Sequence, residues 1–303
     1  MDKKTVIMYT NLMNQIIKIR NHNRQGSYKT KERYFEANQR FVKFLAERYG
    51  TKKFSNISDN HIKSYIQDMK DRGLSVATIK TDLGAIRFYH NKVDEPRNRI
   101  SGNENFELGR RKFGGVPRAW SDDEFKAFQD VCKKHGNDRA ASISNLAFNE
   151  GLRIHETLKI ERSHVEEALK TGQLFVKGKG GKIRYVPLSG TSKNMLIDII
   201  EDVPRGSKLF VKEDEKTHLV KSQIQNFINK HRSEFQQEDR IVNGQKIGIT
   251  FHGLRHKYAQ GQYEELVNKG FSELKAREEV SKLLGHERDE VTLIYLCKNK
   301  GGY

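Results

Sequence analysis

Six residues in the second half of the chain are of types that could hold and cleave a phosphodiester. They stand in the short motifs GLRIHE, GKGGK, HGLRH, LLGHE and VTLIYL, and they are Arg153, Lys179, His252, Arg255, His286 and Tyr295. Taken singly, each is more often structural, as an arginine at a helix end or a tyrosine in an apolar run usually is. His252 and Arg255 lie three residues apart and would share one face of a helix. In the glycine-rich motif, Lys177 and Lys182 are equal rivals of Lys179.

Taken together, these residues suit one task, which is to bind a phosphodiester and stabilise the charge that develops when a fifth oxygen attacks it. An arginine fork bonds two phosphate oxygens at once, and preorganised cations usually make the largest single catalytic contribution. A tyrosine can be the nucleophile, and a lysine beside a leaving oxygen can be the general acid. These motifs carry no Asp/Glu cluster with metal-ligand spacing, which argues against two-metal nuclease chemistry.

The composition indicates a polyanionic partner. The chain has 303 residues, with 56 Lys and Arg against 39 Asp and Glu, and a net charge of +17. Residues 1–115 hold 24 basic and 12 acidic residues, a net of +12, whereas residues 116–303 hold 32 and 27, a net of +5. This asymmetry predicts that the first third of the chain is a domain that binds DNA or RNA.

Several classes of protein are excluded by the same composition. The apolar runs are much shorter than a membrane span requires, and the first residues lack the apolar core of a signal peptide. Two cysteines, Cys132 and Cys297, do not make a disulfide framework or a cysteine-based zinc site, and they fit a reducing compartment. We therefore expect a cytoplasmic protein that acts on nucleic acid.

The first third of the chain predicts a basic bundle of four amphipathic helices, over residues 4–22, 30–49, 59–72 and 76–93. Ser58 and Ser75 precede the last two helices and have the side chain of an N-cap. The stretch from Glu95 to Pro117 has no helical period and predicts a basic linker. The expected domains are thus a nucleic-acid-binding bundle over 1–94, a linker over 95–117 and a second domain over 118–303. The residues expected to contact nucleic acid are Lys80, Arg87, Arg110, Arg111 and Lys112.

The second domain is predicted to be mainly α with a small β-sheet, an α+β fold. Ser121 is the expected cap of a helix with the sequence DDEFKAFQDVCKK, and a helix over 138–150 should follow. Alternating residues over 173–177 and 183–187, separated by GKGGK, predict a β-hairpin, to which 208–212 would add a third strand. Helices should return from Gln223 onward, interrupted by a turn at VNGQK.

The order and spacing of the five motifs resemble those of the tyrosine recombinases, the phage-integrase family. GLRIHE resembles the first catalytic box, with Arg153 as its arginine and Glu156 as the acidic residue three positions later. VKGKGGKIRYVPL resembles the hairpin box, whose lysine corresponds to Lys179. HGLRH resembles the His-x-x-Arg box, and LLGH with a tyrosine nine residues on resembles the last box. The basic bundle resembles the family's core-binding domain more weakly.

The resemblance implies a mechanism, in which Tyr295 attacks a DNA phosphate and forms a 3′-phosphotyrosyl bond. Arg153, Arg255 and His286 would bind the non-bridging oxygens, Lys179 would protonate the leaving 5′ oxygen and His252 would assist proton transfer. Glu156 would hold Arg153 or the fold. No cofactor or metal is implied, because the phosphotyrosyl bond conserves the energy of the broken bond. The implied partners are double-stranded recombination sites and three further copies of the chain in a tetramer, with an accessory directionality factor left open.

Two other functions share part of this pattern. A type IB topoisomerase uses the same tyrosine chemistry but rejoins the same strand, and a DNA-binding protein that has lost catalysis would keep the fold. Tyr303 is a second tyrosine near the end of the sequence, but it lacks the spacing from His286 that favours Tyr295 as nucleophile. Only eight residues follow Tyr295, so we expect subunits to be coupled by the segment that carries Tyr295 or by another contact.

Overall fold

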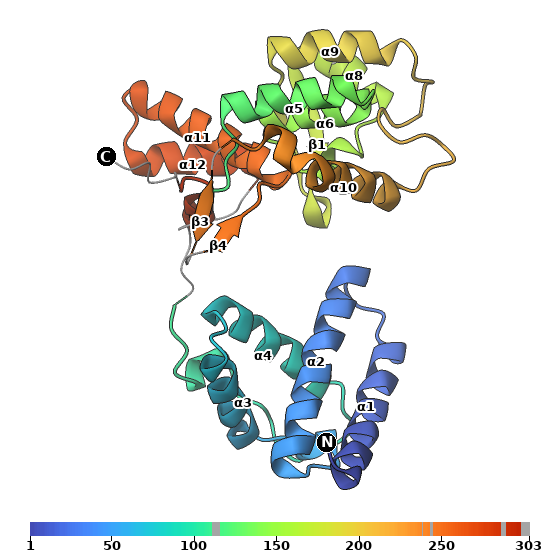
Figure 1. Ribbon diagram of the computed structural model, residues 1–303, viewed down its shortest axis with the longest axis vertical. Coiled ribbons are helices and arrows are strands. Elements are labelled where there is room, and N and C mark those ends of the chain that lie inside the picture. Colours follow the sequence, from blue (N-terminus) through green and yellow to red (C-terminus); the bar gives the residue numbers. More distant parts are fainter. Residues whose placement is uncertain (111–115, 238, 243–244, 286–288, 298–303) are drawn as a thin grey trace. The chain divides into compact units, whose positions relative to one another are not determined.

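The chain forms two compact units, Met1–Lys112 and Phe113–Tyr303, in a computed structural model (Figure 1). The structure describes residues 1–110, 116–237, 239–242, 245–285 and 289–297. Each unit has its own hydrophobic core. Among the described helices, none is both long enough and apolar enough to cross a membrane.

The N-terminal unit contains the four predicted helices, which confirms the expected bundle. They are α1 (Lys3–His22), α2 (Tyr28–Tyr49), α3 (Asp59–Asp71) and α4 (Val76–His90). Helix α2 packs against both α1 and α4 (Figure 1). Ser75 accepts a hydrogen bond from the Thr78 amide at the start of α4, and Ser58 takes part in a capping box with His61 at the start of α3. Capping of these otherwise unpaired amides explains why the helices begin where they do.

The first part of the segment predicted as a linker packs onto this bundle. Ile100 and Phe106 are buried in the core of the N-terminal unit. The Arg87 guanidinium donates to the Ser101 carbonyl at 3.2 Å and to Asn103 Oδ1 at 2.7 Å. These contacts involve an irregular stretch whose regular structure is a short 3-10 turn, Asn103–Asn105. The sequence of such a stretch has no helical period, so its packing could not be predicted.

The C-terminal unit is mainly helical, as predicted, with two small antiparallel sheets in its described part. Its helices are α5 (Asp122–Lys134), α6 (Asp138–Asn149), α7 (Ile154–Thr157), α8 (Arg162–Thr171), α9 (Gly190–Ile200), α10 (Thr217–Phe235), α11 (His252–Asn268) and α12 (Glu273–Leu284). Its strands are β1 (Gln173–Lys177), β2 (Ile183–Pro187), β3 (Arg240–Val242) and β4 (Gln245–Ile247). The hairpin β1–β2 is the predicted one, with Phe175 opposite Tyr185.

Three expectations about this unit differ from the structure. Residues 208–212, all of them described, form no third strand: only Lys208 makes an isolated bridge, with Glu161. The apolar residues of that stretch are instead buried in the core as an irregular segment. The region around VNGQK includes the second hairpin, β3–β4, and α10 begins at Thr217 rather than at Gln223. Short apolar runs do not distinguish a strand from any other buried segment.

The start of α11 is held tightly against the chain that precedes α5. A Cβ on Gly253 would lie 2.2 Å from the Arg118 carbonyl oxygen, so only glycine allows this approach. The Trp120 indole donates to the Thr250 carbonyl at 2.9 Å and its ring stacks on Phe235. This packing fixes the position of the helix that carries His252 and Arg255.

Candidate active site

Arg153 is presented by a sharp turn between α6 and α7. Gly151 has φ +65°, a left-handed conformation that favours glycine, and a Cβ there would lie 2.3 Å from the ring of Tyr258. The chain then turns into α7, where the Arg153 amide donates to Glu156 Oε2 at 2.8 Å. The Arg153 guanidinium donates to Glu156 Oε1 at 2.8 Å, and about a quarter of its side chain stays exposed (24%). Arg153 is therefore anchored to Glu156, and part of its side chain is exposed to solvent.

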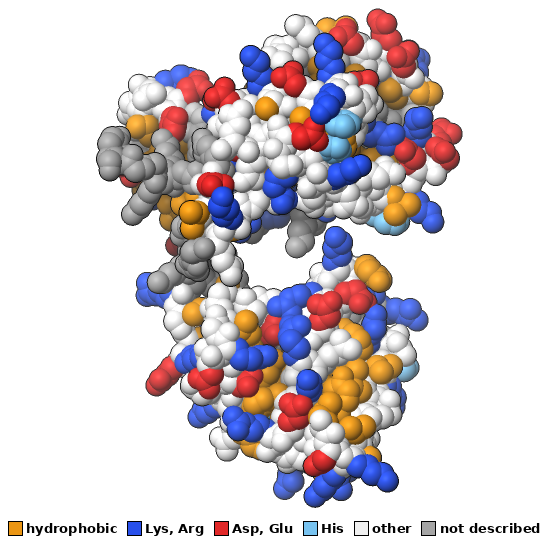
Figure 2. All heavy atoms as spheres, in the orientation of Figure 1, with side chains coloured by type: hydrophobic (Ala, Val, Ile, Leu, Met, Phe, Trp, Pro, Cys, Tyr) orange, Lys and Arg blue, Asp and Glu red, His pale blue; other side chains and the backbone are white. Residues whose placement is uncertain are grey.

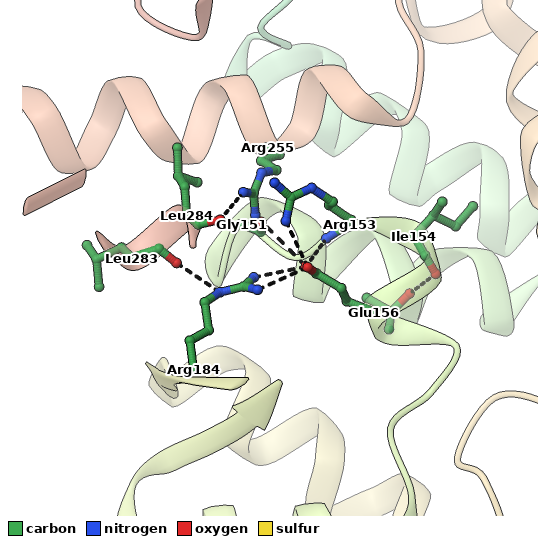
Figure 3. A network of polar contacts seen from close by, with 9 residues as sticks. Gly151, Arg153, Ile154, Glu156, Arg184, Arg255, Leu283 and Leu284 are labelled. Atoms are coloured by element: carbon green, nitrogen blue, oxygen red, sulfur yellow. Dashed lines mark hydrogen bonds and ion pairs between the residues drawn. The ribbon is translucent and has the colours of Figure 1, made fainter. Parts of the chain in front are cut away.

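Glu156 is the centre of the network drawn in Figure 3, and its carboxylate is fully buried. Arg184 donates to both carboxylate oxygens, at 3.0 and 2.9 Å, and Arg255 Nη1 lies 3.9 Å from Oε2. Burial alone would raise the pKa of Glu156, but the hydrogen bonds and charge of Arg184, with smaller contributions from Arg153 and Arg255, lower it to about 2. The carboxylate is thus ionised and contacts three arginines, as expected of a residue that holds Arg153.

Arg184 was not among the residues predicted from the sequence. It lies on β2, whose neighbours Ile183 and Tyr185 are exposed, and it shares the buried face of the strand with Val186. Its Nε donates to the Leu283 carbonyl at 3.0 Å, at the end of α12. Arg184 therefore links the hairpin, Glu156 and the helix that leads to Tyr295. The alternation of the predicted strand placed Arg184 on the same face as Val186, and a charged residue on a buried face could have indicated a role in the site.

Arg255 is almost completely buried, with 1% of its surface exposed. Its guanidinium donates to the carbonyls of Gly151 and Leu284. Burial and the nearby charge of Arg153 lower the pKa of Arg255 to about 10, which leaves it positively charged at neutral pH. A charge held by backbone carbonyls and by Glu156 keeps a fixed direction, so it is preorganised.

The ring of Tyr295 lies within this cluster. It is 5% exposed, and its centroid is 5.4 Å from the His252 ring, 4.5 Å from the His256 ring and 5.7 Å from Arg255 Cζ. Packing of the His252 ring, followed by the charges of Arg255, Arg153 and Arg118, lowers the pKa of His252 well below its usual value. His252 as a whole residue is exposed, so its neutral imidazole can be reached from solvent.

His256 was also missed, although it follows His252 by one helical turn on α11. It is fully buried, and burial, followed by the charge of His252, lowers its pKa to about 3. This neutral ring packs against the Tyr295 ring at an interplanar angle of 36°. The i, i+4 spacing of the two histidines was the signal in the sequence.

The six predicted catalytic residues differ in how much the structure says of them. Arg153, Arg255, His252 and Tyr295 come together in the C-terminal unit. Lys179 begins the turn Lys179–Gly181 between β1 and β2, but its side chain lies outside the described part of the chain. His286 and Tyr303 are also outside the described residues.

The five residues predicted to contact nucleic acid lie in or next to the N-terminal unit. Lys80 is half-buried on α4, and Arg110 is exposed. Arg87 donates to the 95–108 segment, as described above, and its contact with nucleic acid stays a prediction. Arg111 and Lys112 lie outside the described residues. Figure 2 shows Lys and Arg side chains spread over the visible face of this unit.

Gln260 on α11 holds the backbone next to Tyr295. Its Nε2 donates to the carbonyls of Tyr295 and Cys297, both at 3.0 Å. A side-chain amide nitrogen has two hydrogens, so this one group uses both to fix the segment on each side of Leu296. Gln260 therefore acts on Tyr295 by positioning its backbone.

Replacing Gln260 with glutamate should slow the attack on a DNA phosphate that the sequence predicts for Tyr295. The carboxylate has the same size but donates no hydrogen bond, so two bonds worth about 1 kcal/mol each are lost. We expect the first-order rate of covalent adduct formation to fall by roughly ten- to a hundredfold while DNA affinity is unchanged. Gln262→Glu, two residues along the same helix, adds the same charge and should leave the rate near wild type. Equal rates in the two variants would rule out the positioning role.

Known proteins share both units of this chain. The Phage integrase family profile matches residues 120–301, and the profile of the phage integrase N-terminal SAM-like domain matches residues 12–97. Tyrosine recombinase XerC of Lacticaseibacillus casei strain BL23 is 23% identical over 287 residues, which cover 90% of this chain and 89% of the relative. Tyrosine recombinase XerD of Oceanobacillus iheyensis is 26% identical over 267 residues, 84% of this chain and 82% of the relative.

Solved structures share the fold. A lambda integrase dimer bound to a COC' core site has a TM-score of 0.63 and 15% identity, and covers 100% of this chain and 83% of its own. XerH site-specific recombinase bound to a palindromic difH substrate has a TM-score of 0.63 and 19% identity, with coverage of 99% and 86%. With the profile match over most of its length, the chain belongs to the phage integrase family and is a tyrosine-type site-specific recombinase.

Proposed function

We propose that Tyr295 is the nucleophile that cuts and rejoins DNA and that Arg153, Arg255 and His252 act on the same phosphate. The observation that carries this proposal is the packing of the Tyr295 ring beside His252 and Arg255 within one chain. The buried carboxylate of Glu156 orients the guanidinium groups of Arg153 and Arg184, because it accepts hydrogen bonds from both.

In the proposed first step, Tyr295 Oη attacks phosphorus as the bond to the 5′ oxygen breaks. The neutral His252 assists removal of the phenolic proton, and Lys179 delivers a proton to the leaving 5′ oxygen. Arg153, Arg255 and His286 bind the non-bridging oxygens. The products are a 3′-phosphotyrosyl bond and a free 5′-hydroxyl, so neither a metal nor a nucleotide cofactor is consumed. Attack by a 5′-hydroxyl of the partner duplex reverses the step and exchanges the strands.

The assembly proposed for this reaction is a tetramer on two double-stranded recombination sites. A solved relative of the same fold is a lambda integrase tetramer bound to a Holliday junction. In our proposal the N-terminal unit, with the segment that follows it, grips the DNA over the core site, and the C-terminal unit performs catalysis. The coupling between subunits would use the segment that carries Tyr295.

The test of this function compares strand exchange with simple relaxation. Flanking DNA of the gene is offered as two sites on one plasmid, and recombinant products are scored together with changes in supercoiling. A recombinase gives exchanged products that need both sites. Relaxation that proceeds equally without a site, and with no exchanged product, would instead identify a topoisomerase activity.

DNA binding should depend steeply on salt, because the N-terminal part of the chain carries most of the positive charge. If six or more phosphates are contacted, affinity should fall by about 10³-fold or more between ~50 and ~200 mM salt through counterion release. The measurement is the dissociation constant by fluorescence anisotropy at several salt concentrations. Lys80→Gln should reduce the slope of log K against log salt by about 1.

Arg87→Gln tests the second predicted contact on the same helix. The Arg87 guanidinium already bonds Ser101 and Asn103, so this variant should lower the melting temperature as well as the salt slope. A salt slope unchanged by Arg87→Gln would leave Arg87 with a structural role only, and one unchanged by Lys80→Gln would remove Lys80 from the phosphate contacts.

A further inference from the structure

Away from the catalytic cluster, two histidines and a glutamate meet where α5 ends beside α10. His135 follows the last residue of α5, whereas His231 and Glu234 lie three residues apart on α10. One ligand atom from each of the three residues lies within 4.8 Å of the other two. The sequence did not predict this cluster, because His135 and His231 are far apart along the chain.

The two imidazoles approach the same carboxylate, one at each oxygen. His231 Nδ1 lies 2.5 Å from Glu234 Oε1, and His135 Nε2 lies 3.6 Å from Glu234 Oε2. Ligand atoms bound tetrahedrally to zinc at about 2.1 Å are separated by roughly 3.4 Å. The two observed separations, which involve different oxygens of Glu234, lie on either side of that value, so side-chain rotation is needed to bring one atom of each residue to a single ion.

The backbone beneath the cluster is held by the aromatic core. Phe128 of α5 packs against Phe227 and Phe235 of α10, at ring-centroid distances of 6.1 and 5.0 Å. The His231 ring lies 4.6 Å from Phe227 and 4.1 Å from the His135 ring. The His231 side chain is only 9% exposed, whereas those of His135 and Glu234 are about one third exposed. The backbone that carries the donors is therefore held by the aromatic core, while the side chains of His135 and Glu234 remain partly exposed to solvent.

The chemistry of the donors matches a borderline metal such as Zn²⁺. Two imidazoles and one carboxylate form a set that zinc uses in proteins, with water in the fourth position. The Glu234 carboxylate supplies the anionic oxygen ligand of this set. Lys134 Nζ lies 2.9 Å from Glu234 Oε2 and competes with a cation for that oxygen.

We propose that His135, His231 and Glu234 form a binding site for a Zn²⁺-class divalent metal that joins the end of α5 to α10. The site shares no residue with the proposed catalytic group of Arg153, His252, Arg255 and Tyr295. The bound ion would take no part in the reaction with DNA. A bound ion would cross-link two helices of the catalytic unit and stabilise the folded chain by mass action.

Titration of the full chain, without a polyhistidine tag, tests this site with Zn²⁺ alone. We expect calorimetry to resolve a binding event that is weakened at least about tenfold by His135→Gln or by His231→Gln, since each removes a ligand. The melting temperature should rise with Zn²⁺ in the wild type and rise less in these variants. His218→Gln, an exposed histidine on the same helix α10, should bind as the wild type does.

Lys134→Gln makes a prediction of the opposite sign. Removing the ammonium frees a carboxylate oxygen and a unit of positive charge next to the ion, so Zn²⁺ should bind more tightly. Because Lys134 and His135 are exposed, Lys134→Gln and His135→Gln should both keep the fold, which circular dichroism checks.

Zinc bound at the catalytic histidines would give a different pattern. His252→Gln would then remove the binding event, and the two α5–α10 histidine variants would keep it. That pattern, or wild-type affinity in both His135→Gln and His231→Gln, would overturn the proposal. So would the lack of any Zn²⁺ binding event or thermal shift in the wild type.

Discussion

Replacing Tyr295 with phenylalanine should abolish covalent protein–DNA adducts while leaving DNA binding within about twofold of the wild type. The variant loses one oxygen, and the ring keeps its contacts with His252 and His256. Removing the oxygen that we propose attacks phosphorus should lower the cleavage rate by at least about 10⁴-fold, since the remaining residues would have no nucleophile to activate. The measurement is adduct formation on a nicked site substrate, read on a denaturing gel beside a binding assay.

Two other tyrosines serve as controls for this result. Tyr258 lies in the same apolar cluster as Tyr295, and burial, followed by the charge of Glu150, raises its pKa to about 12. Tyr258→Phe should therefore keep the adduct, and so should Tyr303→Phe. If Tyr303→Phe lost the adduct and Tyr295→Phe kept it, the nucleophile would have been misassigned.

Replacing Glu156 with glutamine should weaken both folding and catalysis. The fully buried carboxylate bonds Arg153 and Arg184 and faces Arg255, so the variant leaves three clustered arginines without their counter-ion. Breaking a buried ion pair on one side costs about 3–5 kcal/mol, and we expect a loss of this order in the free energy of unfolding. Misplaced arginines should also lower the cleavage rate by roughly a hundredfold or more.

Glu124→Gln separates these two effects. Glu124 is another buried carboxylate of the same unit, bonded through both oxygens to Arg240 at 2.8 and 2.7 Å, and no described contact joins it to Arg153, Arg184 or Arg255. It should reduce stability by a similar amount but slow cleavage much less than Glu156→Gln does. Equal cleavage rates in the two variants, measured well below their melting temperatures, would leave Glu156 with a purely structural role.

The dependence of stability on pH follows from the lowered pKa of Glu156, about 2 against an ordinary 4.5. A depressed carboxylate pKa contributes stability that is fully present above the unfolded value and is lost as pH falls through the folded value. The wild type should therefore exceed Glu156→Gln by a constant margin above about pH 5, and the margin should shrink toward pH 2. Denaturant unfolding of both proteins across this range measures the difference.

Much of the fold could be predicted because its signals are local. Helices α1 to α4 have apolar residues at three- and four-residue steps, and Ser58 and Ser75 mark two of their starts. The hairpin β1–β2 has alternating residues around a glycine-rich turn. The expected strand over 208–212 was wrong because a run of buried apolar residues needs a neighbouring strand to become one, and only tertiary packing supplies or withholds that neighbour.

The residues that hold the site together were less accessible than those proposed to do the chemistry. The motif spacings indicated Arg153, His252, Arg255 and Tyr295, since a short motif keeps its members near one another. Arg184, Gln260 and His256 were missed, although Arg184 and His256 left weak periodic signals. Gln260 left none, because its partners are backbone carbonyls 35 and 37 residues away.

By itself the sequence determined the family, through motifs whose order and spacing resemble it, and the placement of charge, through a net of +12 in residues 1–115. Only the tertiary structure decided which groups meet: that Glu156 gathers three arginines, that Arg184 reaches the end of α12, and that His135 lies beside His231. Local spacing follows from the covalent chain and the helical repeat. Contacts such as Arg255 to Gly151, 104 residues apart, depend on how all the helices pack at once.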